Sequence, residues 1–405
     1  MQSNTNKTFF HDLKDNTTVS YEDLFIYVVG SEPVLLNSSF NNTKEFLFNL
    51  TKALYYDINL TLNDLNNQAE DSSSIDVFNN NNNPKNISEL IERIYKSKSK
   101  ITLFTSGTTG QPKKITHSVL NLFREVRKSE KFKENIWAFA YNPTHMAGLQ
   151  VFFQALSNVN PIYNIFEYPK NDIITIINKY KITNISATPT FYRLLVPLKE
   201  PIESIKNASL GGEKSSTDLI QKISNSFPNA KIMNIYASTE AGTLFSTSGS
   251  YFKILPSKIN LVKIVNGELL IHKSLLGEHQ GIEFQGVWFK SGDMVEIINP
   301  ETNEFVFSSR KNEMINVGGN NVNPIEIETI IDEIPGVKKS YVFGKPNPIL
   351  GNMLYVKIQL HRHDITELSI KQYLNNKLER FQIPRRIEFV EQLSLTRSGK
   401  LKRNL

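Results

Sequence analysis

The sequence predicts an α/β protein with two domains. Residues 1–311 are expected to form a large domain of mainly parallel sheets flanked by helices, with a small β-rich subdomain at about 250–309. Residues 312–405 are expected to form a small α+β domain. Three observations support this. Strand and helix patterns alternate from residue 100 to 236, short β-rich pieces follow, and a new alternation begins after Arg310.

The first hundred residues are rich in asparagine and weakly patterned. The run Asn79–Asn83, followed by Pro84, predicts a solvated loop. The segment Ile87–Tyr95 predicts a helix, because its apolar residues at 87, 90, 91 and 94 share one face.

The alternating region then predicts a largely parallel sheet with crossover helices. The predicted strands are 101–104, 137–141, 161–166, 182–187, 209–212 and 231–236, and the predicted helices are 119–128, 148–157, 172–180, 191–196 and 217–226. In such sheets ligands bind beyond the carboxyl ends of the strands. The loops after Phe104, Tyr141, Ala187, Leu210 and Tyr236 are therefore the candidate site.

In the rest of the chain, the pattern of predicted elements changes twice. The β-rich part predicts strands at 252–255, 259–265, 268–271, 287–289 and 305–308. The last part predicts helices at 324–334 and 369–378 and strands at 339–343, 354–360 and 386–389.

Composition excludes several classes of function. There is no cysteine, which excludes disulfides, thiolate metal sites and a cysteine nucleophile. Lys and Arg number 46 against 40 Asp and Glu, a net charge of +6 that suits an anionic small molecule and is too diffuse to indicate nucleic acid. No apolar run is long enough for a membrane span and the amino terminus has no signal-peptide pattern, so a cytoplasmic location is expected.

The segment from Thr105 to Lys113 has the composition of a phosphate-binding loop. Glycines let backbone N–H groups turn toward an anion, and hydroxyls and a lysine add donors. It is not the loop of the P-loop nucleotide hydrolases, because Lys113 follows the last glycine by three positions and no Ser or Thr follows it. The alternative is a flexible surface turn. The candidate phosphate ligands are Thr105, Ser106, Gly107, Thr108, Thr109, Gly110 and Lys113.

This loop resembles the signature loop of the adenylate-forming superfamily, which includes acyl-CoA synthetases, peptide-synthetase adenylation domains and firefly luciferase. Further segments resemble that superfamily in order: Pro143–Gly148 (PxxHxxG), Gly211–Glu213 (GG[AE]), Asn234–Glu240 (NxYGxTE), Trp288–Asp293 (WFxTGD), Arg310–Glu328 (RxxxxIKxxGxxVxPxEIE) and Leu395–Arg403 (PxTxxGKxxR). The resemblance covers residues from about 100 to 405. By comparison with the family, residues 1–100 form a shortened N-terminal region.

The resemblance implies roles for residues of the larger domain. His145 is expected near the acyl carboxylate, and Gly212 and Glu213 beside the adenine. Tyr236 is expected to stack on the adenine, and Asn234 to lie near its amino group. The expected phosphate and metal ligands are Thr239 for the α-phosphate and Glu240 for Mg²⁺. Taken singly, His145 could be a partly buried structural histidine and the glycine pair a plain turn.

The resemblance also assigns residues after the larger domain's main sheet. Asp293 and Arg310 are expected at the ribose, although Asp293 alone could serve a β-turn. Gly318 and Gly319 resemble the loop that enters the site for thioester formation in CoA ligases. Lys400 is expected to bridge carboxylate and phosphate during adenylation. The C-terminal domain is expected to move about a hinge at Asn312, where the family more often has Asp or Lys.

The implied activity is an AMP-forming acid–thiol ligase that uses ATP and Mg²⁺. A carboxylic acid would become an acyl-adenylate with release of pyrophosphate, and a thiol, with CoA favoured, would take the acyl group. Alternatives are transfer to a carrier-protein phosphopantetheine or an amine, and a non-catalytic nucleotide sensor. The sensor is supported only by the short N-terminal region and by three departures from the family pattern, at Ala237, Asn312 and Ser394. Four retained residues argue against it: Glu240, Asp293, Arg310 and Lys400.

The substrate is expected to be an aryl or fatty acid. Residues 137–154 contain no Asp or Glu to hold an ammonium group, which disfavours an α-amino acid. An apolar acyl group is suggested by Phe139, Met146, Phe152, Phe153 and Tyr192. The alternative is that these side chains belong to the core.

Overall fold

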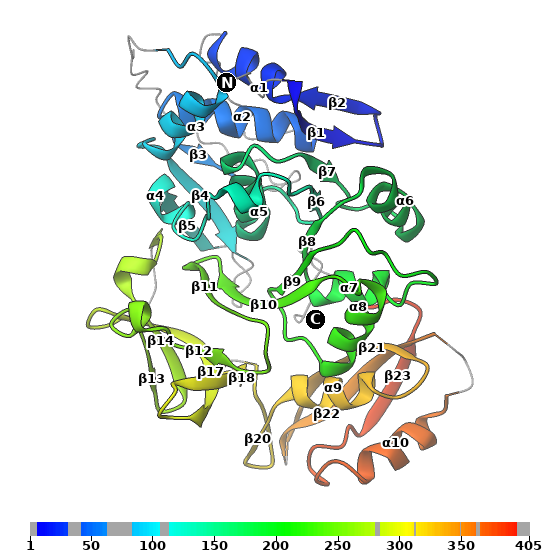
Figure 1. Ribbon diagram of the computed structural model, residues 1–405. Coiled ribbons are helices and arrows are strands. Elements are labelled where there is room, and N and C mark those ends of the chain that lie inside the picture. The colour runs from blue at the N-terminus through cyan, green and yellow to red at the C-terminus, as the bar shows by residue number, and fades with distance from the viewer. Residues whose placement is uncertain are drawn as a thin grey trace. The chain divides into compact units, whose positions relative to one another are not determined.

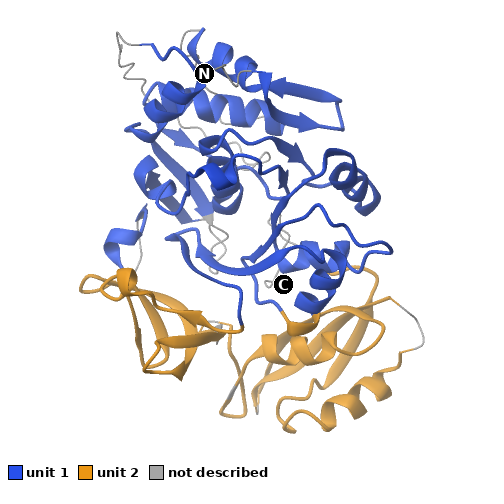
Figure 2. Ribbon diagram, in the orientation of Figure 1, with its two compact units in different colours: residues 1–215, 219–249, 272–283 blue, residues 216–218, 250–271, 284–405 orange. Residues whose placement is uncertain are grey.

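The structure is a computed structural model that describes residues 6–30, 42–62, 83–105, 113–279, 284–311, 313–348, 350–361 and 365–394. Contacts divide the chain into two compact units (Figure 2). Unit 1 comprises residues 1–215, 219–249 and 272–283, and unit 2 comprises residues 216–218, 250–271 and 284–405. The contacts thus group the β-rich segment with the C-terminal region, and the division at residues 311 and 312 stays a prediction.

An eight-stranded sheet of order β11-β10-β9-β8-β6-β7-β1-β2 is the centre of unit 1 (Figure 1). Its strands are β1 (Thr8–Asp12), β2 (Thr17–Ser20), β6 (Trp137–Phe139), β7 (Ile162–Asn164), β8 (Asn184–Ala187), β9 (Asn207–Gly211), β10 (Lys231–Ser238) and β11 (Gly242–Thr247). The six strands from β10 to β1 pair in parallel, and β11 and β2 add an antiparallel strand at each edge. The predicted parallel sheet is confirmed.

Helices connect the parallel strands. They are α5 (Met146–Ser157), α6 (Lys170–Tyr180), α7 (Pro189–Leu195) and α8 (Thr217–Ser226). The chain leaves β6 to form β7 on one side of it, and then forms β8 on the other side. The connections after β6 and β8 therefore run in opposite directions, and α/β sheets usually bind ligands beyond the carboxyl ends of the strands at such a point.

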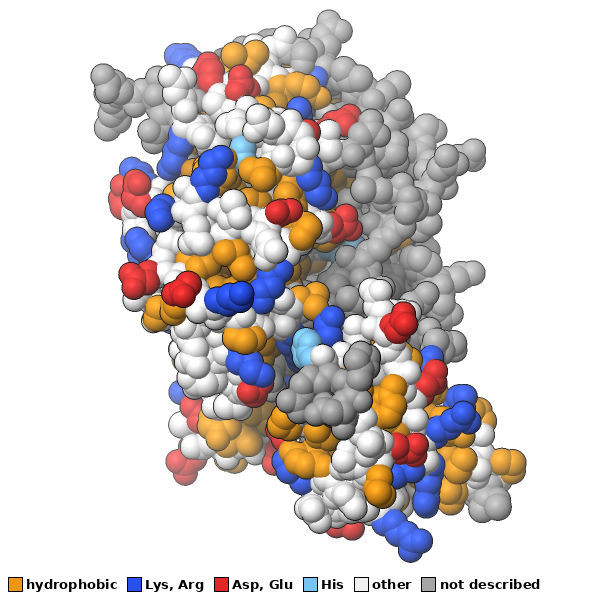
Figure 3. All heavy atoms as spheres, turned by 90° about the vertical axis from the view of Figure 1, so that its right-hand side faces the viewer, with side chains coloured by type: hydrophobic (Ala, Val, Ile, Leu, Met, Phe, Trp, Pro, Cys, Tyr) orange, Lys and Arg blue, Asp and Glu red, His pale blue; other side chains and the backbone are white. Residues whose placement is uncertain are grey.

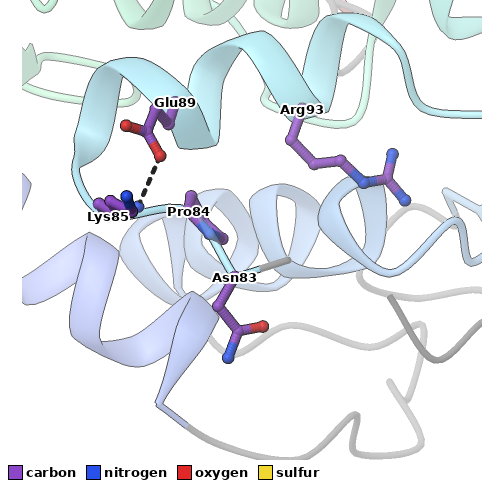
Figure 4. Close-up of a pocket in the computed structure, with 5 residues that line it drawn as sticks. All are labelled: Asn83, Pro84, Lys85, Glu89 and Arg93. Carbon is purple, nitrogen blue, oxygen red and sulfur yellow. Dashed lines mark hydrogen bonds between the residues drawn. The ribbon is translucent and has the colours of Figure 1, made fainter. Parts of the chain in front are cut away.

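The N-terminal region contains three helices, α1 (Tyr21–Val29), α2 (Thr43–Tyr55) and α3 (Ile87–Tyr95), the last with the predicted bounds. Ser20 and Asp23 form a capping box at α1. At α3 the Asn86 side chain accepts from the Glu89 N–H at 3.0 Å, and the Lys85 N–H donates to Glu89 at 2.9 Å (Figure 4). These bonds satisfy backbone donors at the start of the helix.

A second, four-stranded sheet has the order β15-β5-β4-β3. Its strands are β3 (Leu60–Thr61), β4 (Lys100–Thr105), β5 (Lys113–Ser118) and β15 (Glu278–His279), and β5 leads into the short helix α4 (Val119–Leu122). The predicted helix at 119–128 is thus too long, and the strand β5 was not expected. Residues 106–112, which are outside the described residues, fall between two antiparallel strands, whereas the sequence pattern places them between a strand and a helix.

Unit 2 has two sheets. The β-rich one contains β12 (Phe252–Lys253), β13 (Val262–Val265), β14 (Glu268–His272), β16 (Phe284–Gln285), β17 (Trp288–Asn299) and β18 (Glu304–Arg310). The C-terminal one contains β19 (Ile315–Val317), β20 (Asn320–Val322), β21 (Val337–Asn347), β22 (Gly351–Leu360) and β23 (Arg386–Val390), with α9 (Pro324–Asp332) and α10 (Glu367–Asn375).

The apolar side chains proposed for an acyl pocket fill the core instead. Phe139, Phe152, Phe153 and Tyr192 have no exposed surface and Met146 is 6% exposed, and all five belong to hydrophobic core clusters. On the face drawn in Figure 3, basic and acidic side chains are mixed over the described surface. Within the described ranges, no helix has the length and apolarity needed to cross a membrane.

Candidate active site

Polar side chains meet at the carboxyl ends of β6 and β8. Tyr141 follows β6 and is hydrogen-bonded to Ser186 on β8. Burial raises the pKa of the Tyr141 phenol, and the nearby Glu213 carboxylate raises this pKa further. The phenol therefore stays neutral and remains a hydrogen-bond donor beside the carboxyl ends of β6 and β8.

His145 lies at the same edge, as the N-cap residue of α5, and is half-buried. The loop before it is closed by Asn142, whose side chain accepts from the Thr144 N–H at 2.9 Å and from its hydroxyl at 2.8 Å. Gly148 packs directly on this loop, because a Cβ there would lie 2.3 Å from the Asn142 carbonyl oxygen. The glycine of the PxxHxxG segment thus lets α5 start close to the loop that carries His145.

Gly212 and Glu213 follow β9, the neighbour of β8. Gly212 has a φ of +85°, which favours glycine. Glu213 Oε2 accepts from the Thr190 hydroxyl at 2.7 Å and from its N–H at 3.2 Å, and lies 3.5 Å from Arg193 Nη1. Its Oε1 is buried and has no hydrogen-bond partner among the described residues. The loop after β9 is therefore fastened to α7, with one buried acceptor left over.

The end of β10 carries the next set of predicted residues. Asn234 accepts a hydrogen bond from the Ser215 hydroxyl at 2.7 Å, which ties β10 to the loop after β9. Tyr236 is half-buried, with its ring 5.9 Å from that of Phe245 on β11. The β10–β11 pairing shifts register between Tyr236 and Ala237. Ala237, where the family pattern has Gly, thus lies at an irregularity in the pairing of the strand.

Thr239 and Glu240 form the turn between β10 and β11, and both are half-buried. The Thr239 carbonyl oxygen lies 2.7 Å from His117 Nε2. His117 is 1% exposed and is the last residue but one of β5. Sequence reasoning missed this histidine because strand β5 was not expected. The signal that could have found it is its position four residues after Lys113, just beyond the candidate phosphate loop.

Glu240 is the candidate Mg²⁺ ligand. Within the described ranges, no group of three or more His, Asp or Glu side chains could hold a metal by itself. A single half-buried carboxylate fits Mg²⁺ that takes its remaining ligands from phosphate oxygens and water. The residues present are therefore suited to a metal that arrives with ATP.

Unit 2 joins the two residues predicted for the ribose. Asp293 on β17 and Arg310 on β18 are paired in register, and Arg310 Nε donates to Asp293 Oδ1 at 2.7 Å. The Asp293 residue is 6% exposed, whereas the Arg310 side chain is 48% exposed. Behind them, the Gly292 N–H donates to Glu268 at 3.1 Å. The pair presents a fixed carboxylate with one cation beside it.

Gly318 and Gly319 form the two-residue turn of the β19–β20 hairpin. Their φ values are +58° and +88°, and Val317 and Asn320 close the turn as a pair. Two successive positive φ values are those of a type I′ turn, which accounts for the paired glycines. The Gly319 N–H also bonds the Asn316 side chain at 3.2 Å.

Several predicted residues lie outside the described residues. They are Ser106, Gly107, Thr108, Thr109, Gly110, Asn312 and Lys400. Thr105 and Lys113 are described as a cross-strand pair that closes β4 on β5. Their pairing gives both ends of the predicted phosphate loop a fixed base.

Comparison with known proteins identifies the family. Residues 59–271 match the model of the AMP-binding enzyme family, and residues 326–400 match that of the AMP-binding enzyme C-terminal domain. Among curated proteins, the 2-succinylbenzoate–CoA ligase of Staphylococcus aureus strain MSSA476 is 28% identical over 329 residues. The match covers 75% of this chain and 65% of the length of that relative.

Two solved structures show the same fold. ATP-bound MatB from Rhodopseudomonas palustris is similar with a TM-score of 0.73 and 16% identity, over 99% of this chain and 95% of the other. The o-succinylbenzoate CoA synthetase MenE of Bacillus subtilis, in complex with its acyl-adenylate intermediate, has a TM-score of 0.72 and 17% identity, over 98% and 94%. With two family models matched in order and the fold in agreement, the chain belongs to the AMP-binding enzyme family.

Proposed function

We propose that this protein is an AMP-forming acid–CoA ligase. In the first half-reaction, a carboxylate oxygen attacks the α-phosphorus of ATP, and the bond to pyrophosphate breaks. In the second, the sulfur of CoA attacks the acyl carbon, and AMP leaves. The family membership supports this proposal, and so does the similarity to a curated 2-succinylbenzoate–CoA ligase.

One structural observation carries the proposal. The neighbouring parallel strands β9 and β10 end in Gly212–Glu213 and in Asn234–Glu240, and the Ser215–Asn234 hydrogen bond joins the two ends. Two independent motifs of the sequence therefore meet at the carboxyl edge of the sheet, where α/β sheets bind nucleotides.

The chemistry of each residue suits it to a particular part of the substrates. Tyr236 offers an aromatic face to the adenine, and the Asp293 carboxylate can accept from both ribose hydroxyls. Thr239 and the Thr105–Lys113 loop supply donors to the phosphates, and we assign His145 to the carboxylate of the acid. Lys400 neutralises charge between carboxylate and phosphate. Mg²⁺, when held by Glu240, reduces the repulsion between the two anions.

The substrate we propose is an aryl or fatty acid, and not an α-amino acid. The absence of Asp and Glu from residues 137–154 supports the exclusion. The buried aromatic residues named above do not bear on the choice, because they fill the core. The relative's activity makes 2-succinylbenzoate the first acid to test.

The first experiment is to measure pyrophosphate release from Mg-ATP with 2-succinylbenzoate, simpler aryl acids and fatty acids, each with and without CoA. Release that needs an acid, and a thioester product that needs CoA, are expected. Release that CoA leaves unchanged would instead favour a carrier-protein or amine acceptor. ATP binding without release for any acid would favour the nucleotide sensor.

Lys400→Ala tests the division between the half-reactions. We expect pyrophosphate release to fall by about 10²–10³-fold, because a charge-neutralising donor is lost at the reacting phosphate. Thioester formation from preformed acyl-adenylate and CoA should stay within about threefold of wild type. Lys402→Ala, on the same basic tail, is the matched control and should leave both rates unchanged. Equal loss of both half-reactions in Lys400→Ala would contradict the role of Lys400.

A further inference from the structure

The turn between β10 and β11 is fastened through its backbone (Figure 1). Thr239, Glu240 and Ala241 present three consecutive carbonyl oxygens, and each accepts a hydrogen bond from elsewhere in unit 1. The donors are His117 Nε2 to Thr239 at 2.7 Å, the Gly277 N–H to Glu240 at 2.8 Å, and Arg124 Nη2 to Ala241. Peptide planes with satisfied carbonyls resist rotation, so the directions of the Thr239 and Glu240 side chains are set from outside the turn.

The proton on His117 is placed by a chain of donors that runs in one direction. Arg124 Nη1 donates to Asn121 Oδ1, and a guanidinium can only donate. The Asn121 amide therefore turns its Nδ2 toward His117, where it lies 2.9 Å from Nδ1. Nδ1 is the acceptor, so the imidazole proton is on Nε2 and is donated to the Thr239 carbonyl.

Local structure holds this chain of donors in place. His117 is the last residue but one of β5, and Ser118, which ends the strand, caps α4 by accepting the Asn121 N–H at 3.2 Å. Gly277 packs on His117 so closely that a Cβ would lie 2.7 Å from the His117 Cε1. The imidazole is thus confined between β5, α4 and the segment that enters β15.

We propose that His117, oriented by Asn121 and Arg124, positions the Thr239–Glu240 turn for Mg-ATP. The proposal rests on the proposed roles of Thr239 and Glu240. His117 acts through the Thr239 carbonyl and is a positioning residue, not a catalytic one. Without its hydrogen bond, the turn can tilt and move the Glu240 carboxylate away from the metal.

His117→Leu and His117→Gln separate positioning from packing. Gln can place an amide N–H near the position of Nε2, whereas Leu fills space without donating. We expect His117→Leu to lower the rate of pyrophosphate release by about 10–100-fold, since small misplacements at a reacting centre have effects of this size. The Mg²⁺ concentration for half-maximal rate should rise, while the KM for ATP stays within about threefold. His117→Gln should recover most of the rate and the wild-type Mg²⁺ dependence.

A second measurement needs no acid substrate, and so separates this proposal from the proposed function. The thermal shift produced by ATP is measured in EDTA and again with Mg²⁺. His117→Leu should keep the shift in EDTA and lose the additional shift caused by Mg²⁺. If the wild type releases no pyrophosphate with any acid, the ligase proposal fails, and this measurement still decides the positioning role.

Thr116→Val is the matched control. Thr116 precedes His117 on β5 and bonds Thr102 at 2.8 Å, away from the turn. It should leave the Mg²⁺ dependence unchanged. Asn121→Leu should shift the Mg²⁺ dependence in the same direction as His117→Leu, but by less. It replaces His117→Leu as the test if the His117→Leu protein does not fold. Wild-type Mg²⁺ dependence in both assays for the His117→Leu or Asn121→Leu protein would overturn the proposal.

Discussion

At the scale of single residues, two glycines shape the site because they have no side chain. They are Gly148 and Gly277, and the backbone of each packs closely against a neighbouring group next to a residue proposed for the site. At Gly148 the neighbour is the Asn142 carbonyl, and at Gly277 it is the ring of His117. These glycines therefore fix the positions of His145 and of the Thr239–Glu240 turn.

Gly148→Ala should lower the free energy of unfolding by about 2–3 kcal/mol, because the new methyl overlaps backbone atoms that cannot move aside cheaply. Its Cβ would lie 2.3 Å from the Asn142 carbonyl oxygen and 3.1 Å from the Pro143 Cα. Urea unfolding measures the change. Gly249→Ala is the control, since the nearest atom to its Cβ would be 3.6 Å away, and it should change stability by less than about 0.5 kcal/mol. Equal effects of the two substitutions would contradict the close-packing argument.

The sequence predicted these residues unequally, for a physical reason. Glu213, Asn234 and Glu240 belong to motifs that follow apolar strands, so the rule for parallel sheets was enough to group them. His117 contacts the turn from 122 residues away in the chain. Its role depends on the pairing of β15 with β5, a long-range contact that no local pattern encodes.

At the scale of elements, an ion pair joins the N-terminal helices to the second sheet. Asp57 follows α2 and accepts from Arg93 of α3, with an Nη2–Oδ2 distance of 2.5 Å. It also accepts from the Ser97 hydroxyl at 3.0 Å and the Lys98 N–H at 2.7 Å, just before β4. Burial alone would raise the pKa of Asp57, but these hydrogen bonds lower it below its ordinary value.

Asp57→Asn should therefore destabilise the protein in a pH-dependent way. The folded-state pKa of Asp57 is lowered, so its contribution is fully present above the unfolded-state pKa of about 3.9 and is lost as pH falls through the folded value. At pH 7 the loss should be about 2 kcal/mol, the size expected for hydrogen bonds to a charged group. Urea unfolding between pH 7 and pH 3 should show the wild type and the variant converging at low pH. A difference that is constant with pH would mean that the charge of Asp57 does not stabilise the fold.

Elements were predictable where their apolar pattern was local. Helices α3 and α8 have the predicted bounds, because each carries a clear apolar stripe and polar flanks. Strand β5 was missed because its sequence, KKITHS, alternates weakly, and its strand structure comes from pairing with β4 and β15. The residues 1–100, which looked unpatterned, contribute β1 and β2 to the edge of the main sheet.

At the scale of the whole molecule, the residues assigned to the proposed reaction are distributed over the two units. Thr239 and Glu240 lie in unit 1, and Asp293, Arg310 and the Gly318–Gly319 turn lie in unit 2. Among the described strands, the β-rich sheet and the C-terminal sheet share no strand, and the chain passes between them after β18. Asn312 falls at this passage, outside the described residues. We propose that a change of backbone angles at this passage turns the C-terminal sheet as a body.

Asn312→Pro tests that hinge. Proline fixes φ near −65° and also restricts the preceding Lys311, so it should hold the C-terminal region in a narrow range of orientations. We expect pyrophosphate release to stay within about threefold, and thioester formation from the acyl-adenylate to slow by about tenfold or more, because we propose that the rotation serves only the second step. Single-turnover measurements of each half-reaction give the two rates. Asn312→Ala, which leaves φ free, is the control. If Asn312→Pro forms thioester at the wild-type rate, the rotation between half-reactions does not pass through residue 312.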